Sequence, residues 1–507
     1  MKTKRIRIIS LILVLSMTVL THFIASCGEK TNSTAVNETS AAGNDTPGGD
    51  GSDNTATTAD IPFPYEPIDL KGANFKILID RQWSGNSLDV TDYDIEEMNG
   101  EVLNDAIYNR NLIIQDMYNL KFVPIHAEDT IETMMSKAMK AAIDEYDAVA
   151  VRLLRAAIFA SKGFAVNVFD TSLTLDAPWW DQNIIKDTSI GGAAYFFAGD
   201  IFIKHYDGID MLMFNKKLLN EFGLESPYNL VNSNQWTMDK FNELVKADGI
   251  KLDLDNNDKM NRYDRYGFVT QIDYLPSFVI ACGEKFVSKD GNDMPYFTGN
   301  TEKASNIIDK MLEVYVDYTY DMHRDAYGRD SGSGQLVQFW VFPEGRGLFY
   351  WGFPRYMELG LRDMEDDYGI VPIPKWDSSQ DRYYAMVNNW HSYTYVLPRT
   401  VGDVDRNSQV LDAMAYYGMK LIKPAYYEVC LQRKYSRDEE SSAMLDIIFS
   451  STCYDIGSVY GVGGYIDALC DNLQKGNNTV MTSYEKLQGK IEKDINKLIE
   501  QFENAKQ

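Results

Sequence analysis

The sequence predicts an α/β protein built of two lobes. Short apolar runs alternate with amphipathic helical stretches, which is typical of parallel sheets covered by helices. Roughly 445 residues follow the N-terminal segment, which is too many for a single hydrophobic core. In open sheets of this kind ligands bind beyond the carboxyl ends of the strands, so we expect functional side chains there.

The first part of the body shows this alternation most clearly. The pattern predicts strand, helix, strand, helix and strand at residues 75–80, 103–117, 120–125, 131–143 and 146–151. Trp83 follows the first of these strands, and Arg152 and Arg155 follow the third. We therefore expect these three side chains at the ligand-facing edge of the sheet.

A second α/β region begins near Met211. In it, Thr237 is placed to cap a helix, Asp239 suits the positive end of that helix, and an apolar stripe starts at Phe241. The chain ends with another amphipathic helix, whose apolar face is formed by Leu487, Ile491, Ile495, Leu498, Ile499 and Phe502.

The N-terminus has the pattern of an export signal. Basic residues precede an apolar stretch at 8–20, which is too short to span a bilayer comfortably, and Ile24-Ala25-Ser26-Cys27 has the form of a lipoprotein cleavage site. We interpret residues 1–26 as a signal peptide and Cys27 as the lipid-attachment residue. The mature chain is then extracytoplasmic and lipid-anchored to the outer face of the cell membrane. A plain signal peptide with a chance cysteine, and an N-terminal membrane anchor, are the alternatives.

Residues 27–61 have a different composition from the rest of the chain. They are rich in Ser, Thr, Asn, Gly and Asp and contain almost no large apolar side chain. Such a segment cannot bury enough apolar surface to offset the entropy of ordering it. We predict a flexible tether between the lipid anchor and the globular body.

Charge, cysteines and motifs exclude several classes of function. A formal net charge of −25 disfavours nucleic acid as a partner and adhesion to anionic lipid surfaces. Cys282, Cys430, Cys453 and Cys470 have no zinc-site spacing, and whether they form disulfides or stay buried free thiols is left open. No hydrolase, zinc-protease, P-loop or dinucleotide motif is present, so we predict a protein that is not an enzyme and has no catalytic cofactor. We also expect a monomer.

Three segments carry a resemblance to a known family. They are Gly-Gly-Ala-Ala-Tyr-Phe at 191–196 leading into 208–219, Trp-Thr-Met-Asp-Lys-Phe at 236–241, and Tyr-Gly-Ile-Val-Pro-Ile-Pro at 368–374. In this order they resemble the extracellular solute-binding proteins of bacterial ABC importers, family 1, in the branch of sugar-binding lipoproteins. The resemblance runs, with gaps, from about residue 70 to the C-terminus. Segments 170–190 and 434–470 match no part of it.

The resemblance implies a two-lobed periplasmic-binding-protein-like fold with hinge-crossing segments and a ligand cleft. Carried over to this chain, lobe 1 is 62–204 plus 392–436, and lobe 2 is 209–388 plus 440–507. The hinges lie near 204–208, 389–391 and 436–438. The function it implies is capture of a small solute, an oligosaccharide, for delivery to the permease subunits of an ABC transporter. The alternatives are a surface glycan-binding or sensory lipoprotein without transport, and a lipid-anchored glycan-degrading enzyme.

The same resemblance implies the ligand contacts. The expected aromatic partners are Tyr274, Trp351, Trp390 and His391, with Arg152 or Arg155 as the polar partner. A sugar ring packs its apolar C–H face on an aromatic ring while its hydroxyls need charged or amide partners. The alternative for Tyr274 and Trp351 is a place in the core, and for the two arginines a surface ion pair. Trp179 and Trp180 are expected to pack within a lobe.

A twelve-residue segment predicts a structural calcium ion. Asp253, Asp255 and Asn257 take positions one, three and five of an EF-hand-like loop. The Lys259 carbonyl, Asn261 and Asp264 take positions seven, nine and twelve. Position six is Asp258 instead of glycine, and the flanks lack a clear pair of EF helices. A solvated Asn/Asp turn is therefore the alternative.

Overall fold

The computed structural model describes residues 61–80, 92–271, 274–321, 338–432 and 439–506. Its first sheet has the strand order β12-β3-β1-β2. The strands are β1 (Ala73–Ile79), β2 (Leu120–His126), β3 (Ala148–Arg152) and β12 (Tyr393–Val396). β1 is parallel to β2 and β3, as the alternating pattern predicts, and β12 is antiparallel to β3. Ile77, Leu78 and Val149 are fully buried, because helices cover both faces of the sheet.

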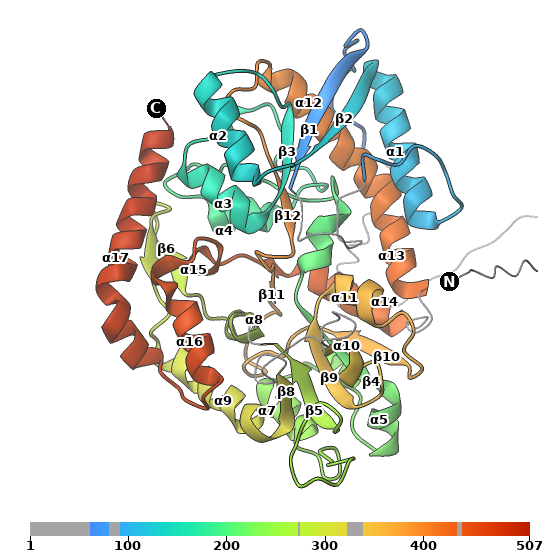
Figure 1. The fold of residues 1–507 in the computed structure, drawn as a ribbon, viewed down its shortest axis with the longest axis vertical. Coiled ribbons are helices and arrows are strands. Elements are labelled where there is room, and N and C mark those ends of the chain that lie inside the picture. The colour runs from blue at the N-terminus through green and yellow to red at the C-terminus, as the bar shows by residue number, and fades with distance from the viewer. Residues whose placement is uncertain (1–60, 81–91, 272–273, 322–337, 433–438, 507) are drawn as a thin grey trace, which may run out of the picture. The chain divides into compact units, whose positions relative to one another are not determined.

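The second sheet has the order β10-β4-β9-β5-β8 (Figure 1). Its strands are β4 (Met211–Asn215), β5 (Tyr266–Thr270), β8 (Thr319–Asp321), β9 (Gly347–Gly352) and β10 (Tyr368–Val371). β5 is parallel to β8 and β9, whereas β4 is antiparallel to β9 and β10. Trp236, Phe241 and Phe349 pack ring against ring on this sheet, with centroids 5.2–6.1 Å apart.

Helices lie between and around the strands. Those of the first half are α1 (Val102–Tyr118), α2 (Ile131–Ala141), α3 (Leu153–Ser161), α4 (Gln182–Thr188), α5 (Lys216–Glu221), α6 (Pro227–Asn232), α7 (Met238–Val245) and α8 (Tyr274–Ala281). The later ones are α9 (Glu302–Tyr318), α10 (Gln338–Val341), α11 (Pro354–Gly360), α12 (Val404–Tyr417), α13 (Lys423–Gln432), α14 (Glu439–Ser450), α15 (Ile456–Val459), α16 (Tyr465–Leu473) and α17 (Val480–Ala505). The predicted cap of α7 is confirmed, because the Thr237 hydroxyl accepts the Lys240 N–H at 3.5 Å. In the described part of the chain, no helix has the length and apolarity needed to cross a membrane.

Three short segments lie side by side where the chain passes between the sheets. The 3₁₀ helix η3 (Ile203–Gly208) leads into β4, and β11 (Ala385–Met386) leads towards β12. β11 pairs in parallel with β13 (Thr452–Cys453), and Ile209 forms a bridge with Val387. The contact is so close at Gly208 that a Cβ there would lie 2.4 Å from the Ser392 nitrogen. Only glycine fits this crossing.

The two adjacent tryptophans pack within the fold, as predicted. Trp179 and Trp180 are 2% and 3% exposed. Both indole N–H groups donate to Oδ1 of the buried Asp412, at 3.0 and 2.7 Å. The same carboxylate accepts the backbone N–H and the hydroxyl of Thr174. Segment 170–181, which matches no family pattern, is therefore fixed to α12 by one buried acid.

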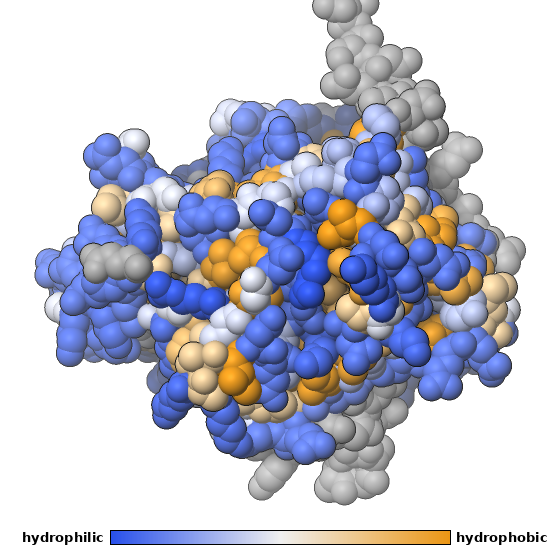
Figure 2. Space-filling model, turned by 90° about the horizontal axis from the view of Figure 1, so that it is seen from above, coloured by the Kyte–Doolittle hydropathy of each residue, from blue (hydrophilic) through white to orange (hydrophobic). Residues whose placement is uncertain are grey.

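The C-terminal helix α17 runs past elements of both halves of the chain (Figure 1). Its buried face includes Ile491, Ile495, Leu498 and Phe502, as the sequence predicts. The ring of Phe502 packs edge-on against Tyr195 with centroids 5.0 Å apart. On the face of the molecule seen in Figure 2, apolar residues form several separate groups among hydrophilic ones.

Candidate functional site

Two charged side chains meet at the carboxyl ends of the first-sheet strands. Asp80 follows β1, and Arg152 ends β3. The Arg152 Nε donates to Asp80 Oδ2 at 2.7 Å, and the two residues are 5% and 4% exposed. Burial raises the pKa of the Asp80 carboxyl, and the guanidinium of Arg152 counteracts this only in part. Arg152 thus lies at the predicted edge of the sheet and is engaged in a buried ion pair.

An aromatic group lies next to this pair. The His391 ring packs against Phe353 with centroids 4.3 Å apart and against Tyr356 at 6.1 Å. Burial, together with the positive charges of Arg355 and Arg152, lowers the pKa of His391 to about 3. The imidazole is therefore neutral at physiological pH and offers one donor and one acceptor.

Residues of the second sheet reach the same group. Gln271 follows β5, and its side-chain amide donates to the Tyr356 hydroxyl at 3.4 Å. On the η3 crossing, Lys204 pairs with Asp207 at 3.0 Å. Burial alone would lower the pKa of Lys204, but the Asp207 carboxylate raises it above its usual value. Strand ends of both sheets and the crossing segments therefore converge on one polar and aromatic region.

A cavity of about 320 Å³ opens beside this region. Its lining residues are Pro276, Met386, Asn388, Asn389, Trp390, Gly457, Ser458, Gly461, Val462, Gly464, Tyr465, Ile466, Asp467, Cys470 and Asp471. Trp390 is 49% exposed, which is unusual for an indole in a folded protein. The volume is at the small end of the range of ligand pockets, roughly 300–1,000 Å³.

Asn388 is one of the polar residues that line the cavity. It is only 4% exposed, and its Oδ1 accepts the backbone N–H of Trp390 at 3.0 Å. Its Nδ2 makes no hydrogen bond to any other residue that the structure describes. Since the backbone N–H of Trp390 fixes Oδ1 as the acceptor end of the amide, Nδ2 is a hydrogen-bond donor on a residue that lines the cavity. The cavity therefore offers an apolar indole face and an amide donor side by side.

The other residues predicted from the sequence lie elsewhere or outside the described chain. Tyr274 is 1% exposed and packs among Phe268, Phe278 and Tyr315. Trp351 is fully buried on β9. Arg155 forms an ion pair with Glu132 on α2. The predictions for Trp83 and Cys27 fall outside the described residues.

Several lining residues were not predicted from the sequence. Asn388, Asn389 and Ser458 carry no motif, and Ser458 lies in segment 434–470, which matched no family pattern. The signal that could have found this segment is its glycines. Gly461 and Gly464 both have φ above +60°, which allows the turn before α16 that forms one wall.

The predicted metal loop brings its acidic residues together. Oxygens of Asp253, Asp255 and Asp264 lie within 4.8 Å of one another. Asp258, at position six, has φ +63°, the left-handed conformation that glycine usually supplies there. Burial alone would raise the pKa of Asp253, but the N–H groups of Asp258 and Asn257 lower it below its usual value. The loop therefore holds an ionised carboxylate among further oxygen donors, which is the chemistry that Ca²⁺ prefers.

Residues of the loop also form hydrogen bonds with one another. The Asn257 and Asn261 amides donate to Asp255 Oδ2 at 2.8 and 3.1 Å, and Asp264 accepts the Leu254 N–H at 2.9 Å. These bonds form without an ion, so the alternative of an Asn/Asp turn also accounts for the geometry.

Two buried cysteines are free thiols. These are Cys282 and Cys453. Burial raises the pKa of the Cys453 thiol to about 12, so it stays protonated and unreactive.

Comparisons with known proteins give matches at the level of structure. No family model matches the chain, and no curated protein matches it either. A maltose-binding periplasmic protein from Listeria monocytogenes, in complex with maltose, has a TM-score of 0.54 at 14% identity and covers 84% of this chain and 98% of its own.

Two further solved structures are similar. An ABC substrate-binding protein from Listeria monocytogenes, in complex with cycloalternan, has a TM-score of 0.52 at 10% identity, covering 84% of this chain and 99% of that one. An ABC transporter solute-binding protein from Thermotoga lettingae, bound with α-D-tagatose, has a TM-score of 0.50 at 14% identity, covering 84% and 100%. At such identities the likeness establishes the fold. The chain has the two-lobed periplasmic-binding-protein-like α/β fold that its sequence predicts.

Proposed function

We propose that this protein is an extracytoplasmic solute-binding lipoprotein that captures a small oligosaccharide and delivers it to the permease of an ABC transporter. The observation that carries the proposal is the cavity at residues 388–390, with a half-exposed indole beside a buried amide donor. One side of a pyranose packs on the indole and its hydroxyls accept from Asn388. The three similar structures contain maltose, cycloalternan and tagatose, which agrees with a sugar as the ligand class.

Substitution of the indole tests the site. Trp390→Ala is expected to weaken sugar binding by roughly 1 to 3 kcal/mol, because the stacking surface is lost. Phe169→Ala is the matched control, since Phe169 is also 49% exposed but lies on a different element. Calorimetry with maltotriose and cycloalternan measures both variants. Equal affinity in the wild type and Trp390→Ala would show that the sugar does not bind in the Trp390 cavity.

The alternative functions can be distinguished by neighbouring permease genes and by reaction products. A surface glycan-binding or sensory lipoprotein binds sugar but has no permease, so neighbouring permease genes favour transport. A glycan-degrading enzyme releases products, so intact sugar after long incubation argues against it. The three similar structures bear the names of binding proteins, which favours binding over hydrolysis.

We also propose that the loop at residues 253–264 binds one structural Ca²⁺. Asp253, Asp255, Asn257, the Lys259 carbonyl, Asn261 and Asp264 would supply the oxygens. The three carboxylates that already lie within 4.8 Å of one another support this. The ion would order the loop and would not contact the sugar, because none of its ligands lines the cavity at Trp390.

A further inference from the structure

Segments 170–190 and 434–470, which match no family pattern, meet each other in the structure. Asp181 and Asn183, at the start of α4, bond to β13 and the residues after it. The Asn183 amide donates to the Thr452 hydroxyl at 2.9 Å, and the Tyr454 hydroxyl donates to Asp181 Oδ2 at 2.8 Å. β13 is one of the strands where the chain passes between the sheets. Helix α4 is thus fixed directly to the crossing segments.

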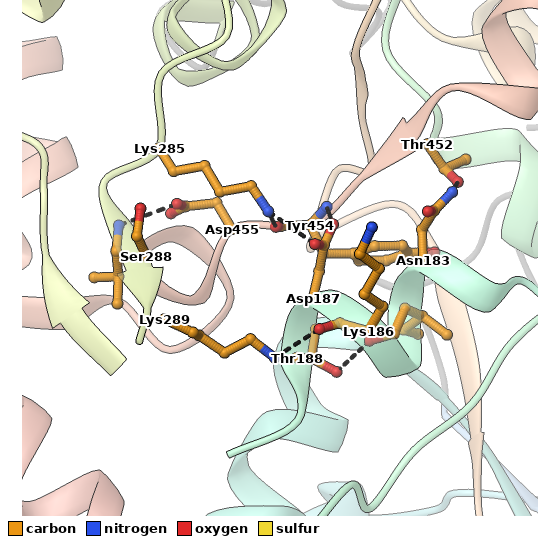
Figure 3. A network of polar contacts seen from close by, with 12 residues as sticks. Asn183, Lys186, Asp187, Thr188, Lys285, Ser288, Lys289, Thr452, Tyr454 and Asp455 are labelled. Carbon is orange, nitrogen blue, oxygen red and sulfur yellow. Dashed lines mark hydrogen bonds and ion pairs between the residues drawn. The ribbon is translucent and has the colours of Figure 1, made fainter. Parts of the chain in front are cut away.

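The far end of α4 is fixed to a hairpin from the other half of the chain. The hairpin consists of β6 (Val287–Lys289) and β7 (Pro295–Phe297). Lys289 Nζ donates to the Lys186 carbonyl at 2.6 Å (Figure 3). It also donates to the Ser189 hydroxyl at 2.9 Å. From the hairpin turn, Asp293 accepts the Gly192 N–H at 2.9 Å and the Ser189 hydroxyl at 3.0 Å.

An ion pair adds a third contact between α4, the hairpin segment and the residues after β13. Lys285 Nζ lies 2.8 Å from Asp187 Oδ1 and donates to the Tyr454 carbonyl at 3.2 Å (Figure 3). The other oxygen of Asp187 accepts the Tyr454 N–H at 3.0 Å. We call the contacts among residues 181–193, 285–297 and 452–454 the brace.

Asp455 connects the brace to the wall of the cavity. It is 1% exposed, and it accepts the Phe286 and Val287 N–H groups of the hairpin at 2.9 and 3.2 Å. It also accepts the Ser458 N–H at 2.8 Å, as the N-cap of α15. The Ser458 carbonyl in turn accepts the Asn389 amide at 2.8 Å, and both residues line the cavity.

We propose that the brace stays closed in solution and sets the wall of the Trp390 cavity from outside, with Asp455 as the positioning residue between them. Every link is a hydrogen bond of 2.6–3.2 Å, and several involve charged groups in partly buried surroundings, where such bonds are strongest. Lobe movement, where it occurs, then takes place with these contacts intact. This proposal deepens the proposed function but does not depend on which solute binds.

Amide hydrogen exchange of the full, ligand-free chain tests the proposal. In the wild type, the amides of Gly192, Phe286 and Ser458 are expected to be protected within about tenfold of Val387, whose N–H bonds across the crossing strands. Rapid exchange of Gly192 and Phe286 while Val387 stays protected would show that the brace opens, which overturns the proposal. Since no sugar is present, a failed ligand screen does not affect this result.

A lysine substitution tests the link to the cavity. Lys289→Ala is expected to speed exchange at least about tenfold at Gly192, Ser458 and Trp390 while leaving Ile79 of β1 unchanged. Lys289→Arg is expected to restore the wild-type rates. Lys303→Ala is the control, because Lys303 pairs with Glu284 at 3.6 Å beside the same hairpin but does not touch α4.

Two outcomes contradict the positioning role. If Lys289→Ala speeds exchange equally at Ile79, the lysine only stabilises the whole fold. If exchange changes at Gly192 but not at Ser458 and Trp390, the brace does not reach the cavity. Asp455→Asn separates the last link, because it should speed exchange at Phe286 and Ser458 and leave Gly192 protected.

Discussion

Asp92 is a buried acid close to the crossing segments. It is 2% exposed, and its Oδ2 has no hydrogen-bond partner in the described part of the chain. Burial raises its pKa from 3.8 to about 6, although the charges of Arg110 and Lys204 lower it. Because the folded-state pKa is raised, protonation of Asp92 favours folding. That contribution is complete below about pH 4 and is lost as the pH rises through 6.

The raised pKa of Asp92 leads to a prediction about stability at the residue scale. At pH 7.5 the ionised carboxylate destabilises the fold, so Asp92→Asn is expected to be more stable than the wild type by on the order of 1 to 3 kcal/mol. The difference should shrink towards zero at pH 4. Denaturant unfolding at both pH values measures it, with the exposed Asp446→Asn as control. A difference that does not change with pH would contradict the assignment.

Single residues also show how far the sequence leads to the site. Trp390 lines the cavity and can be picked out as an aromatic side chain on a crossing segment. Trp351 and Tyr274 are equally aromatic but fully enclosed. β9 is buried on both faces, so its apolar run Gly-Leu-Phe-Tyr-Trp-Gly has no alternation that separates a ligand-facing side chain from a core one.

At the scale of elements, the periodicity of apolar residues predicts individual strands and helices but not how distant strands pair. β1, α1, β2, α2 and β3 appear in the expected order, because each apolar run and each stripe is complete within its own segment. The pairing of β12 with β3 joins Thr394 to Val151 across 243 residues, and no local pattern contains that information. The same holds for the bond between Asn389 and Ser458, which spans 69 residues.

The prediction at the scale of elements is that calcium binding to the loop at residues 253–264 stabilises the protein. With millimolar calcium outside the cell, even a site with a dissociation constant around 10⁻⁴ M is filled. At tenfold excess over that constant the ion adds about 1.4 kcal/mol of stability. The wild type is therefore expected to melt at a higher temperature in calcium than in chelator.

Substitutions show whether this effect comes from the loop. Asp253→Ala should abolish the difference between calcium and chelator, and the exposed Asp446→Ala should keep it. Identical melting of the wild type in both buffers would mean that the loop is only a hydrogen-bonded turn.

At the scale of the whole molecule, the proposed anchor determines where the body works. The interpretation of Cys27 rests on the sequence, since residue 27 lies outside the described residues. Cys27→Ser is expected to release the protein from membranes or to block its processing, because the thioether to the diacylglycerol cannot form. Labelling with a fatty-acid analogue followed by membrane fractionation measures this. Equal label in the wild type and the variant would refute the anchor.

The proposed binding cavity is formed by elements that are distant in sequence. The cavity draws residues from α8, the β11 segment, α15 and α16, so no single element forms it. Such a site is complete only in the folded chain, and a bound ligand would therefore stabilise the whole fold.

The most direct test of the central claim is a thermal-shift screen of the protein against a panel of glycans and small solutes, followed by calorimetry of any hit. We predict that at least one oligosaccharide raises the melting temperature progressively as its concentration increases, binds with one-to-one stoichiometry and is recovered intact. A panel in which no sugar shifts the melting temperature while another class of solute does, or in which the sugar is cleaved, would contradict the account.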